Sequence, residues 1–234
     1  MAHQSENLPT APPAFIVFDL DGTVVDSADG IVWSFEATLR DFDRPIDRSV
    51  LATLIGPPLH DSFSRLGFGP DLLGDALNRY RAHYGEEGVY RCRLYDGVPA
   101  LLDTIGVRGI PALIATAKRV DFASRMLESL GVAEYFAVVA GAALDGRRSP
   151  KADIVSEALT KFAPASPRGW MVGDRHFDME AARSNRLLGG GATWGYGTVA
   201  ELRESGATWL IDEPSALGRL VDDLFTRSPP RDRP

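Results

Sequence analysis

A short apolar run that ends in two acids constrains this chain more than any other feature. The segment AFIVFDLDGTVVD at 14–26 starts with apolar residues, and Asp19 and Asp21 follow them, with Gly22 and Thr23 next in the chain. Such a run predicts a fully buried strand of a parallel sheet. The acids then lie at the carboxyl end of the strand, where open α/β folds bind their ligands.

Asp19 and Asp21 are spaced so that they can share one substrate. Residues two apart in an extended chain project from the same side. One acid can then act as a nucleophile while the other transfers a proton, if their surroundings separate their pKa values. The alternative is a surface turn, because Asp and Gly favour turns. A turn requires neither a buried strand before it nor a second acid. We therefore favour a substrate site shared by Asp19 and Asp21.

The rest of the chain alternates short apolar strands with helical stretches. This alternation predicts an α/β fold with a parallel sheet covered by helices. The expected strands are 14–20, 110–115, 136–140, 169–173, 187–193 and 208–211. The expected helices are 97–107, 119–130, 150–162, 176–186, 198–205 and 214–225.

The interval 26–92 breaks the alternation. It contains helical stretches near 28–43, 47–54, 59–66 and 70–85 and no convincing strand. We interpret it as a helical cap that can close over a site and exclude water; the alternative is a further set of covering helices. The catalytic core is then expected at 14–25 and 93–226. The polar, proline-containing ends, 1–13 and 227–234, are expected to be disordered tails.

Composition narrows the classes of function. A formal net charge of -7 and a pI near 5.1 argue against a nucleic-acid partner. Cys92 is the single cysteine, and the four histidines show no zinc-ligand spacing. No signal-peptide pattern opens the sequence, and no apolar run approaches membrane-spanning length. We therefore expect a cytoplasmic protein without a membrane partner; the sequence does not predict an oligomeric state.

Three further short motifs fall at or just after predicted strand ends, or open a helix. They are Thr116-Ala-Lys118, Lys151 at the start of a helix, and the segment GDRHFD at 173–178. Each is weak alone. A threonine there is usually structural, a lone lysine is usually a surface charge, and Asp174 with Asp178 could be an N-cap and a first-turn acid. Four apart, these two acids would share one helix face if a helix starts there.

Asp19, Asp174 and possibly Asp178 would form a cluster that offers only oxygen ligands. Such ligands suit Mg²⁺ and not zinc. A hard cation that bridges carboxylates and a phosphate would stabilise charge on a transferring phosphoryl group. No GxGxxG follows the first strand and no GxxxxGK[ST] motif occurs, so the sequence favours neither a dinucleotide site nor a P-loop.

The joint pattern DxDGT, T, K and GDxxxD, in this order, resembles the haloacid dehalogenase superfamily phosphatases with a helical cap after the first motif. The resemblance covers about residues 14–225. Within that branch the chain is similar to phosphoglycolate phosphatases and bacterial 5′-nucleotidase-like hydrolases, through IGPPL at 55–59, ATAK at 115–118, LDGR at 144–147 and WGYG at 194–197. The resemblance implies a Rossmann-like, three-layer fold with a parallel sheet and an inserted all-α cap.

The resemblance also implies roles for the motif residues. Asp19 would attack phosphorus to form an aspartyl-phosphate, and Asp21 would protonate the leaving group and then activate water. Thr116 and Lys151 would bind the phosphoryl oxygens. Ala117 belongs to the same phosphate-binding segment, but close relatives often carry a polar residue there, so the pocket would lose one donor.

The same resemblance implies Mg²⁺ bound by Asp19, the backbone carbonyl of Asp21, and Asp174. Asp178 would support it through Lys151 or a water molecule. The namesake dehalogenases typically lack an acid equivalent to Asp21 and use no metal, which argues against dehalogenation here.

These observations predict a Mg²⁺-dependent phosphatase that acts on a small phosphorylated metabolite. A sugar phosphomutase on the same scaffold is the first alternative, and a non-catalytic phosphate-binding or regulatory module is the second. His60, Arg65 and Arg93 could contact the leaving group, although each also fits a plain surface charge. The sequence does not predict which phosphate ester is hydrolysed.

Overall fold

The computed structural model describes residues 8–56, 59–143 and 150–227, and the chain divides into two compact units. The first unit joins Met1–Val25 to Leu94–Pro234, and the second is Asp26–Arg93. The sequence places the inserted block at 26–92, one residue short of this second unit. The predicted action of the block as a cap stays a prediction.

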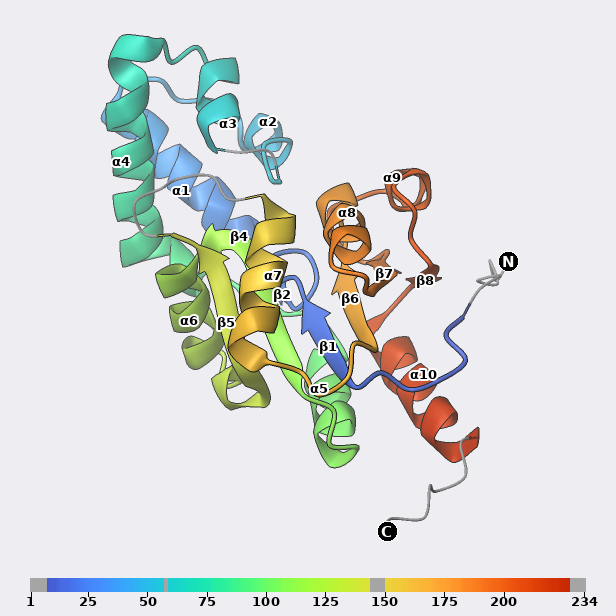
Figure 1. Ribbon diagram of the computed structural model, residues 1–234. Helices are drawn as coiled ribbons and strands as arrows, with labels where there is room; N and C mark the ends of the chain where they lie inside the picture. Colours follow the sequence, from blue (N-terminus) through green and yellow to red (C-terminus); the bar gives the residue numbers. More distant parts are fainter. Residues whose placement is uncertain (1–7, 57–58, 144–149, 228–234) are drawn as a thin grey trace. The chain divides into compact units, whose positions relative to one another are not determined.

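The first unit is built on a six-stranded parallel sheet, and the predicted α/β fold class is confirmed. Its strands are β1 (Phe15–Phe18), β4 (Ala112–Arg119), β5 (Phe136–Ala142), β6 (Gly169–Gly173), β7 (Leu188–Ala192) and β8 (Trp209–Ile211). Their order is β5-β4-β1-β6-β7-β8 (Figure 1). β1 therefore lies between β4 and β6, so the motifs at the ends of these three strands meet at one edge.

Helices cover both faces of this sheet. They are α5 (Val98–Val107), α6 (Val120–Ser129), α7 (Lys151–Phe162), α8 (His176–Ser184), α9 (Val199–Glu204) and α10 (Pro214–Arg227), with the short 3₁₀ helix η2 (Ala133–Tyr135). In Figure 1, α7 lies in front of the sheet and α5 behind it. Phe15 and Val17 belong to the buried cluster under α7 and α8. The alternate residues of the strand, Ile16 and Phe18, face the opposite side of the sheet. Both faces are apolar, which explains the continuous hydrophobic run in β1.

β4 extends further than the sequence predicts. It was expected at 110–115, but it starts at Ala112 and continues to Arg119. Pro111 has no N–H to donate to the ladder, and its carbonyl accepts a hydrogen bond from Ile16 N at 2.9 Å. The strand continues past Thr116 with a shift in its register to β5 between Thr116 and Arg119. The sequence alone shows no irregularity at this position.

The second unit is helical. It contains α1 (Ala28–Asp41), α2 (Arg48–Ala52), α3 (Leu59–Arg65), α4 (Pro70–Glu86) and η1 (Gly88–Tyr90). Phe35 packs on Phe63 and on Tyr80, with ring centroids 5.2 and 4.8 Å apart. Two-residue strands, β2 (Val25–Asp26) and β3 (Arg93–Leu94), pair where the chain enters and leaves the unit. The sequence did not predict these two strands, because two residues carry no periodicity.

Some predicted segments lie outside the described residues. They are 1–7 and 228–234 of the tails, 57–58 of the IGPPL phrase, and the LDGR phrase at 144–147. From Leu8 onward the N-terminal segment is described, and Pro9 and Pro13 are buried. Within the described part, no helix combines the length and apolar character required to cross a membrane.

Candidate active site

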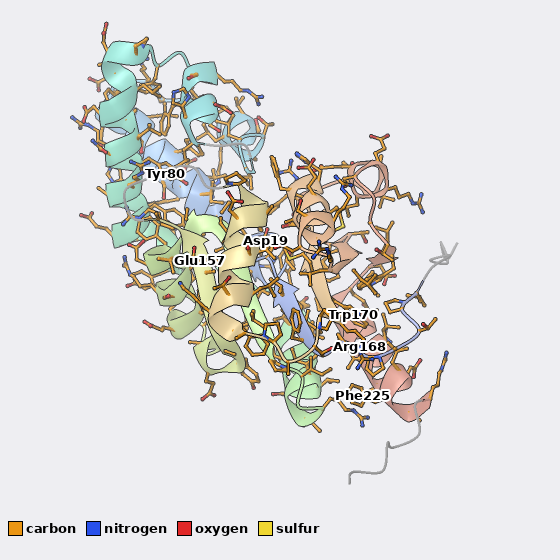
Figure 2. All side chains as sticks on the ribbon, in the orientation of Figure 1. Asp19, Tyr80, Glu157, Arg168, Trp170 and Phe225 are labelled. Atoms are coloured by element: carbon orange, nitrogen blue, oxygen red, sulfur yellow. The ribbon has the colours of Figure 1, made fainter. Side chains whose placement is uncertain are left out.

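Asp19 follows the last residue of β1 and is 8% exposed (labelled in Figure 2). Its backbone N–H continues the ladder to Val172 O at 2.9 Å, and its Oδ1 accepts the N–H of Leu20 at 2.7 Å. Burial raises the pKa of Asp19 to about 8; Lys151 opposes this rise, and Asp178 and Asp174 add to it. The predicted nucleophile is therefore a buried carboxylate held by the strand end.

Lys151 joins two of the acids. It is the first residue of α7, and its side chain is 7% exposed. Its Nζ lies 2.6 Å from Asp19 Oδ1 and 3.0 Å from Asp178 Oδ1. Burial alone would lower the pKa of this ammonium, but the two carboxylates outweigh burial and raise it. Lys151 is thus a fixed buried cation, and the surface-charge alternative is wrong.

Asp174 follows β6 and is completely buried. Thr23 Oγ1 donates to its Oδ1 at 3.2 Å, and the Tyr196 N–H donates to its Oδ2 at 2.8 Å. Burial and the nearby Asp178 raise the pKa of Asp174 to about 6, against the effect of these two donors and of Lys151. Both of its oxygens are therefore oriented by neighbours from other segments.

Asp178 belongs to α8, which begins at His176, so Asp174 lies before the helix. The helix thus begins at the residue predicted for it and not at Asp174, so the two acids do not share a helical face; the N-cap alternative for Asp174 is wrong, because Arg175 takes that position. Asp178 Oδ2 accepts the N–H of Arg175 at 3.0 Å, as a first-turn acid does. The two acids nevertheless converge, because the loop turns Asp174 back toward the helix N-terminus.

The site depends on two glycines at close approaches. Gly22 has φ +87°, and a Cβ there would lie 2.3 Å from Asp174 Oδ2. A Cβ on Gly195 would lie 2.4 Å from the Cβ of Asp174. No L side chain fits at either position. The Gly195 contact was not predicted from the sequence, although the glycine-rich phrase WGYG at 194–197 was a signal for it.

Asp19, Asp174 and Asp178 form the cluster that can hold a metal ion. One carboxylate oxygen from each lies within 4.8 Å of the others. Burial and mutual repulsion raise the pKa values of Asp19 and Asp174, and a bound divalent cation would favour their ionised forms; the all-oxygen site therefore fits a hard divalent cation. Asp178 therefore belongs to the cluster, and it also contacts Lys151, through which the resemblance implies that it acts.

Asp21 contacts the phosphate-binding segment at 116–118 through an ion pair. The Asp21 carboxylate lies 2.9 Å from Lys118 Nζ. Thr116 is buried, and its Oγ1 accepts the Lys118 N–H at 3.2 Å. Ala117 is exposed beside it. The structure thus places Asp21 with Lys118, a residue to which the sequence analysis gave no role.

A network around Glu201 holds the loop that carries Asp174. Glu201 Oε1 accepts Arg175 Nε at 2.9 Å and the His176 N–H at 3.0 Å, and lies 2.7 Å from His176 Nδ1. Burial opposes ionisation, but these hydrogen bonds outweigh it and lower the pKa of Glu201 to about 2. Thr198 caps α9 by accepting the Glu201 N–H at 3.1 Å, so the T-x-x-E spacing was a signal for this residue.

The three basic residues suggested for leaving-group contacts all belong to the second unit. His60 and Arg65 are exposed, and His60 lies 3.4 Å from Asp61. Arg93 pairs with Asp26 at 2.8 Å. Their arrangement agrees with the surface-charge alternative.

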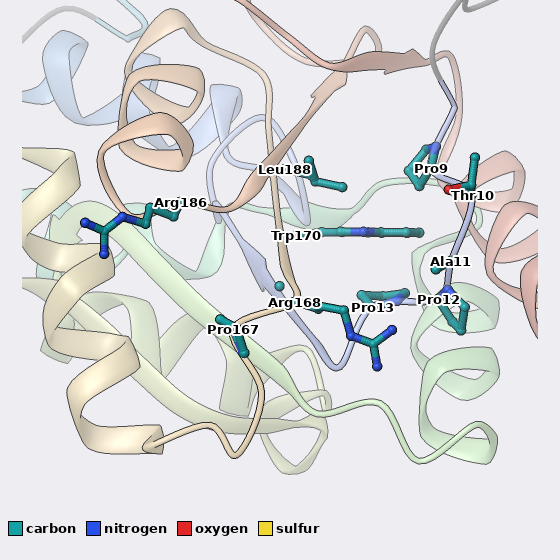
Figure 3. A pocket seen from close by; sticks show the side chains of 11 residues that line it. Pro9, Thr10, Ala11, Pro12, Pro13, Pro167, Arg168, Trp170, Arg186 and Leu188 are labelled. Atoms are coloured by element: carbon teal, nitrogen blue, oxygen red, sulfur yellow. The ribbon is translucent and has the colours of Figure 1, made fainter. Parts of the chain in front are cut away.

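A cavity of about 320 Å³ lies elsewhere in the first unit (Figure 3). Its lining includes Pro9, Pro13, Arg168 and Trp170, at the amino end of β6. Asp174 follows the opposite end of that strand, roughly 13 Å away at 3.3 Å per residue. The cavity is therefore not part of the acid cluster.

Comparison with known proteins agrees with this geometry. Two curated relatives are a tyrosine-protein kinase, PtkA, of Mycobacterium tuberculosis, and a 5′-nucleotidase of Pseudomonas aeruginosa. The kinase is 35% identical, and the match covers 92% of this chain and 74% of the kinase. The nucleotidase is 32% identical, and the match covers 88% of this chain and 95% of the nucleotidase. A crystal structure of a protein assigned as a phosphatase from Clostridium difficile has a TM-score of 0.86 at 29% identity, covering 90% of this chain and 99% of its own.

The family profile described as haloacid dehalogenase-like hydrolase matches residues 16–187, which include every motif residue above. The resemblance derived from the motifs is confirmed, and the chain belongs to the haloacid dehalogenase-like hydrolases.

Proposed function

We propose that this phosphatase hydrolyses small phosphate monoesters with Mg²⁺ and through an aspartyl-phosphate on Asp19. The contact that carries the proposal is the Lys151 ammonium, 2.6 Å from Asp19 Oδ1 and 3.0 Å from Asp178 Oδ1. A buried cation between two carboxylates fixes the orientation of Asp19, as an attacking group requires.

In the first step an Asp19 oxygen attacks phosphorus, and the bond from phosphorus to the leaving oxygen breaks. Asp21 gives its proton to that oxygen. In the second step Asp21 takes a proton from water, the water oxygen attacks phosphorus, and inorganic phosphate leaves Asp19. Lys151 stays protonated throughout and attracts the phosphoryl oxygens.

Asp19 and Asp174 would hold Mg²⁺ together with the backbone carbonyl of Asp21, and Asp178 adds a nearby carboxylate. The bound ion supplies charge stabilisation for the transferring phosphoryl group. Thr23 and the Tyr196 N–H orient Asp174 from the protein side. Thr116 lies at the end of β4, where its hydroxyl can bind a phosphoryl oxygen.

A phosphate-release panel with Mg²⁺ tests this function. The panel contains a nucleoside 5′-monophosphate, phosphoglycolate, a hexose phosphate and p-nitrophenyl phosphate. We expect phosphate release from at least one ester, and its loss in Asp19→Asn. Sugar isomers formed without phosphate release would instead establish a mutase.

A second arm is needed because one relative is named a tyrosine-protein kinase. The protein is incubated with ATP and a tyrosine-containing peptide, and peptide phosphorylation is measured. Transfer to the peptide with no ester hydrolysis would refute the proposal. No turnover in either arm would favour the non-catalytic alternative.

A further inference from the structure

The end of β4 has an irregular register. Thr116 pairs with Gly141 and Arg119 with Ala142, so Ala117 and Lys118 lie between two pairs that are consecutive on β5. Such bulges redirect side chains, and they often occur next to active sites. Here Ala117 is exposed, whereas the Lys118 side chain is 9% exposed. A mostly buried lysine therefore lies at the strand end that carries the phosphate-binding segment.

Lys118 connects two motifs. Its Nζ lies 2.9 Å from Asp21 Oδ1, and its own N–H donates to Thr116 Oγ1 at 3.2 Å. The Asp21 backbone is also fixed, since Asp21 forms a bridge with Val25 and Gly22 N donates to Val25 O at 2.9 Å. Backbone and ammonium together restrict where the Asp21 carboxylate can point.

The environment of this pair differs from that of a surface ion pair. Exposed pairs contribute little, because solvent screens them and two long side chains must be ordered. Lys118 is mostly buried, so its side chain is already ordered by packing, while Asp21 is 22% exposed. The buried Lys118 side chain therefore provides a fixed partner, and this partner holds the partly accessible Asp21 carboxylate in one position.

We propose that Lys118 is a positioning residue that holds the Asp21 carboxylate where it exchanges a proton with the leaving group and with water. This inference rests on the proposed function. A general acid must lie within hydrogen-bond reach of its proton acceptor. Without the ammonium the carboxylate would sample other rotamers, and proton transfer would slow while attack by Asp19 would not.

The experiment compares two substrates with wild type, Lys118→Met, Lys118→Arg, Asp21→Asn and the double variant Lys118→Met/Asp21→Asn. An alkyl phosphate needs a protonated leaving group, whereas p-nitrophenyl phosphate needs little help. We expect Lys118→Met to reduce kcat/KM for the alkyl ester by about 10–100-fold, with a smaller loss for the nitrophenyl ester, because kcat/KM reports the leaving-group step and not the later hydrolysis of the aspartyl-phosphate. Lys118→Arg should restore part of the loss, because it keeps the charge.

The double variant separates positioning from other roles. If Lys118 acts through Asp21, adding Lys118→Met to Asp21→Asn should change kcat/KM little further. Lys161→Met is the matched control; this exposed lysine pairs with Glu157 at the adjacent turn of α7, and its loss should leave both substrates unaffected. Thermal unfolding of each variant checks that it is folded.

Three outcomes would overturn the inference alone. They are equal losses of kcat/KM for the two esters in folded Lys118→Met, additive losses in the double variant, and a change confined to KM, which would make Lys118 a substrate-binding residue. A wild-type protein that turns over no ester would overturn the proposed function and this inference together, so the two failures are distinguishable. If Lys118→Met does not fold, equal losses for the two esters in Lys118→Arg decide against positioning.

Discussion

The acid cluster of the first unit and the paired acids of the second unit have opposite surroundings. In the first unit Asp19, Asp174 and Asp178 are 8, 0 and 0% exposed. In the second unit the described acids in ion pairs lie nearer to solvent; Asp29 and Asp75 have side chains 56 and 52% exposed. A buried charge must be compensated by fixed partners, whereas an exposed charge is compensated by water.

The interiors differ as well. Beneath α7 and α8 the first unit packs aliphatic and small side chains with Phe15, while the second unit is centred on the rings of Phe35, Phe63 and Tyr80. The difference predicts that substitutions in the two units affect different properties of the protein. Substitutions in the acid cluster of the first unit should remove chemistry, whereas substitutions of the paired acids in the second unit should change little. Core substitutions in the second unit should mainly affect stability.

The largest expected effect is that of Asp19→Asn. Turnover should fall by several orders of magnitude while the protein stays folded, because an amide cannot replace a covalent nucleophile. The measurement is phosphate release with circular dichroism as the folding check. The control is Asp75→Asn in the second unit, which removes an exposed pair with Arg79 and should keep near wild-type activity. More than about a tenth of wild-type activity in Asp19→Asn would contradict the assignment.

The next effect concerns metal dependence. Asp174→Ala should abolish activity or raise the Mg²⁺ concentration needed for half-maximal activity about 10–100-fold or more, since it removes an oxygen ligand. Asp178→Ala should also impair activity, because it takes a partner from Lys151. A Mg²⁺ titration after EDTA treatment measures both. Full activity in EDTA, or an unchanged titration in Asp174→Ala, would place the metal elsewhere.

A smaller effect is expected in the aromatic interior of the second unit. Phe63→Ala should cost about 3–5 kcal/mol of the free energy of unfolding of that unit, because it opens a cavity among packed rings. Denaturant unfolding followed by fluorescence measures it. Leu72→Ala is the control within the same unit, since Leu72 is 39% exposed. Similar losses in both variants would show that the rings do not form the stabilising core.

The smallest effect concerns Glu201. Its pKa of about 2 lies below the ordinary value of 4.5, so it stabilises the fold above pH 4.5 and loses this contribution as the pH falls toward 2. Glu201→Gln should therefore cost about 1 kcal/mol at pH 7, and the difference from wild type should shrink below pH 4.5. Thermal unfolding at pH 7 and pH 3.5 measures this; a gap that stays constant would refute the charge contribution.

The sequence predicted the strands and helices of both units because each carries a clear period or an apolar run. The parallel class and the order of motifs at strand ends then followed from general rules for α/β folds. It did not predict the extension of β4 or the strands β2 and β3. A bulge and a two-residue strand are decided by tertiary contacts, not by local pattern.

The site was predictable where residue type and strand position coincide, as at Asp19 and Asp174. The structure adds what cannot be inferred from spacing: Lys151 between two acids, Lys118 beside Asp21, and Glu201 beneath the Asp174 loop. Each joins segments far apart in the chain. α8 begins at His176, as the sequence predicts, and contacts from Thr23 and Tyr196 hold Asp174 outside the helix.

The pairing of Asp26 with Arg93 has a consequence for how such proteins diversify. The inserted unit starts and ends at two neighbouring residues, joined by an ion pair of 2.8 Å and by the short β2-β3 pairing. Closely spaced ends let a host fold accept an insertion without rerouting its own chain. The inserted unit can therefore be exchanged or shortened without rerouting the strands of the first unit.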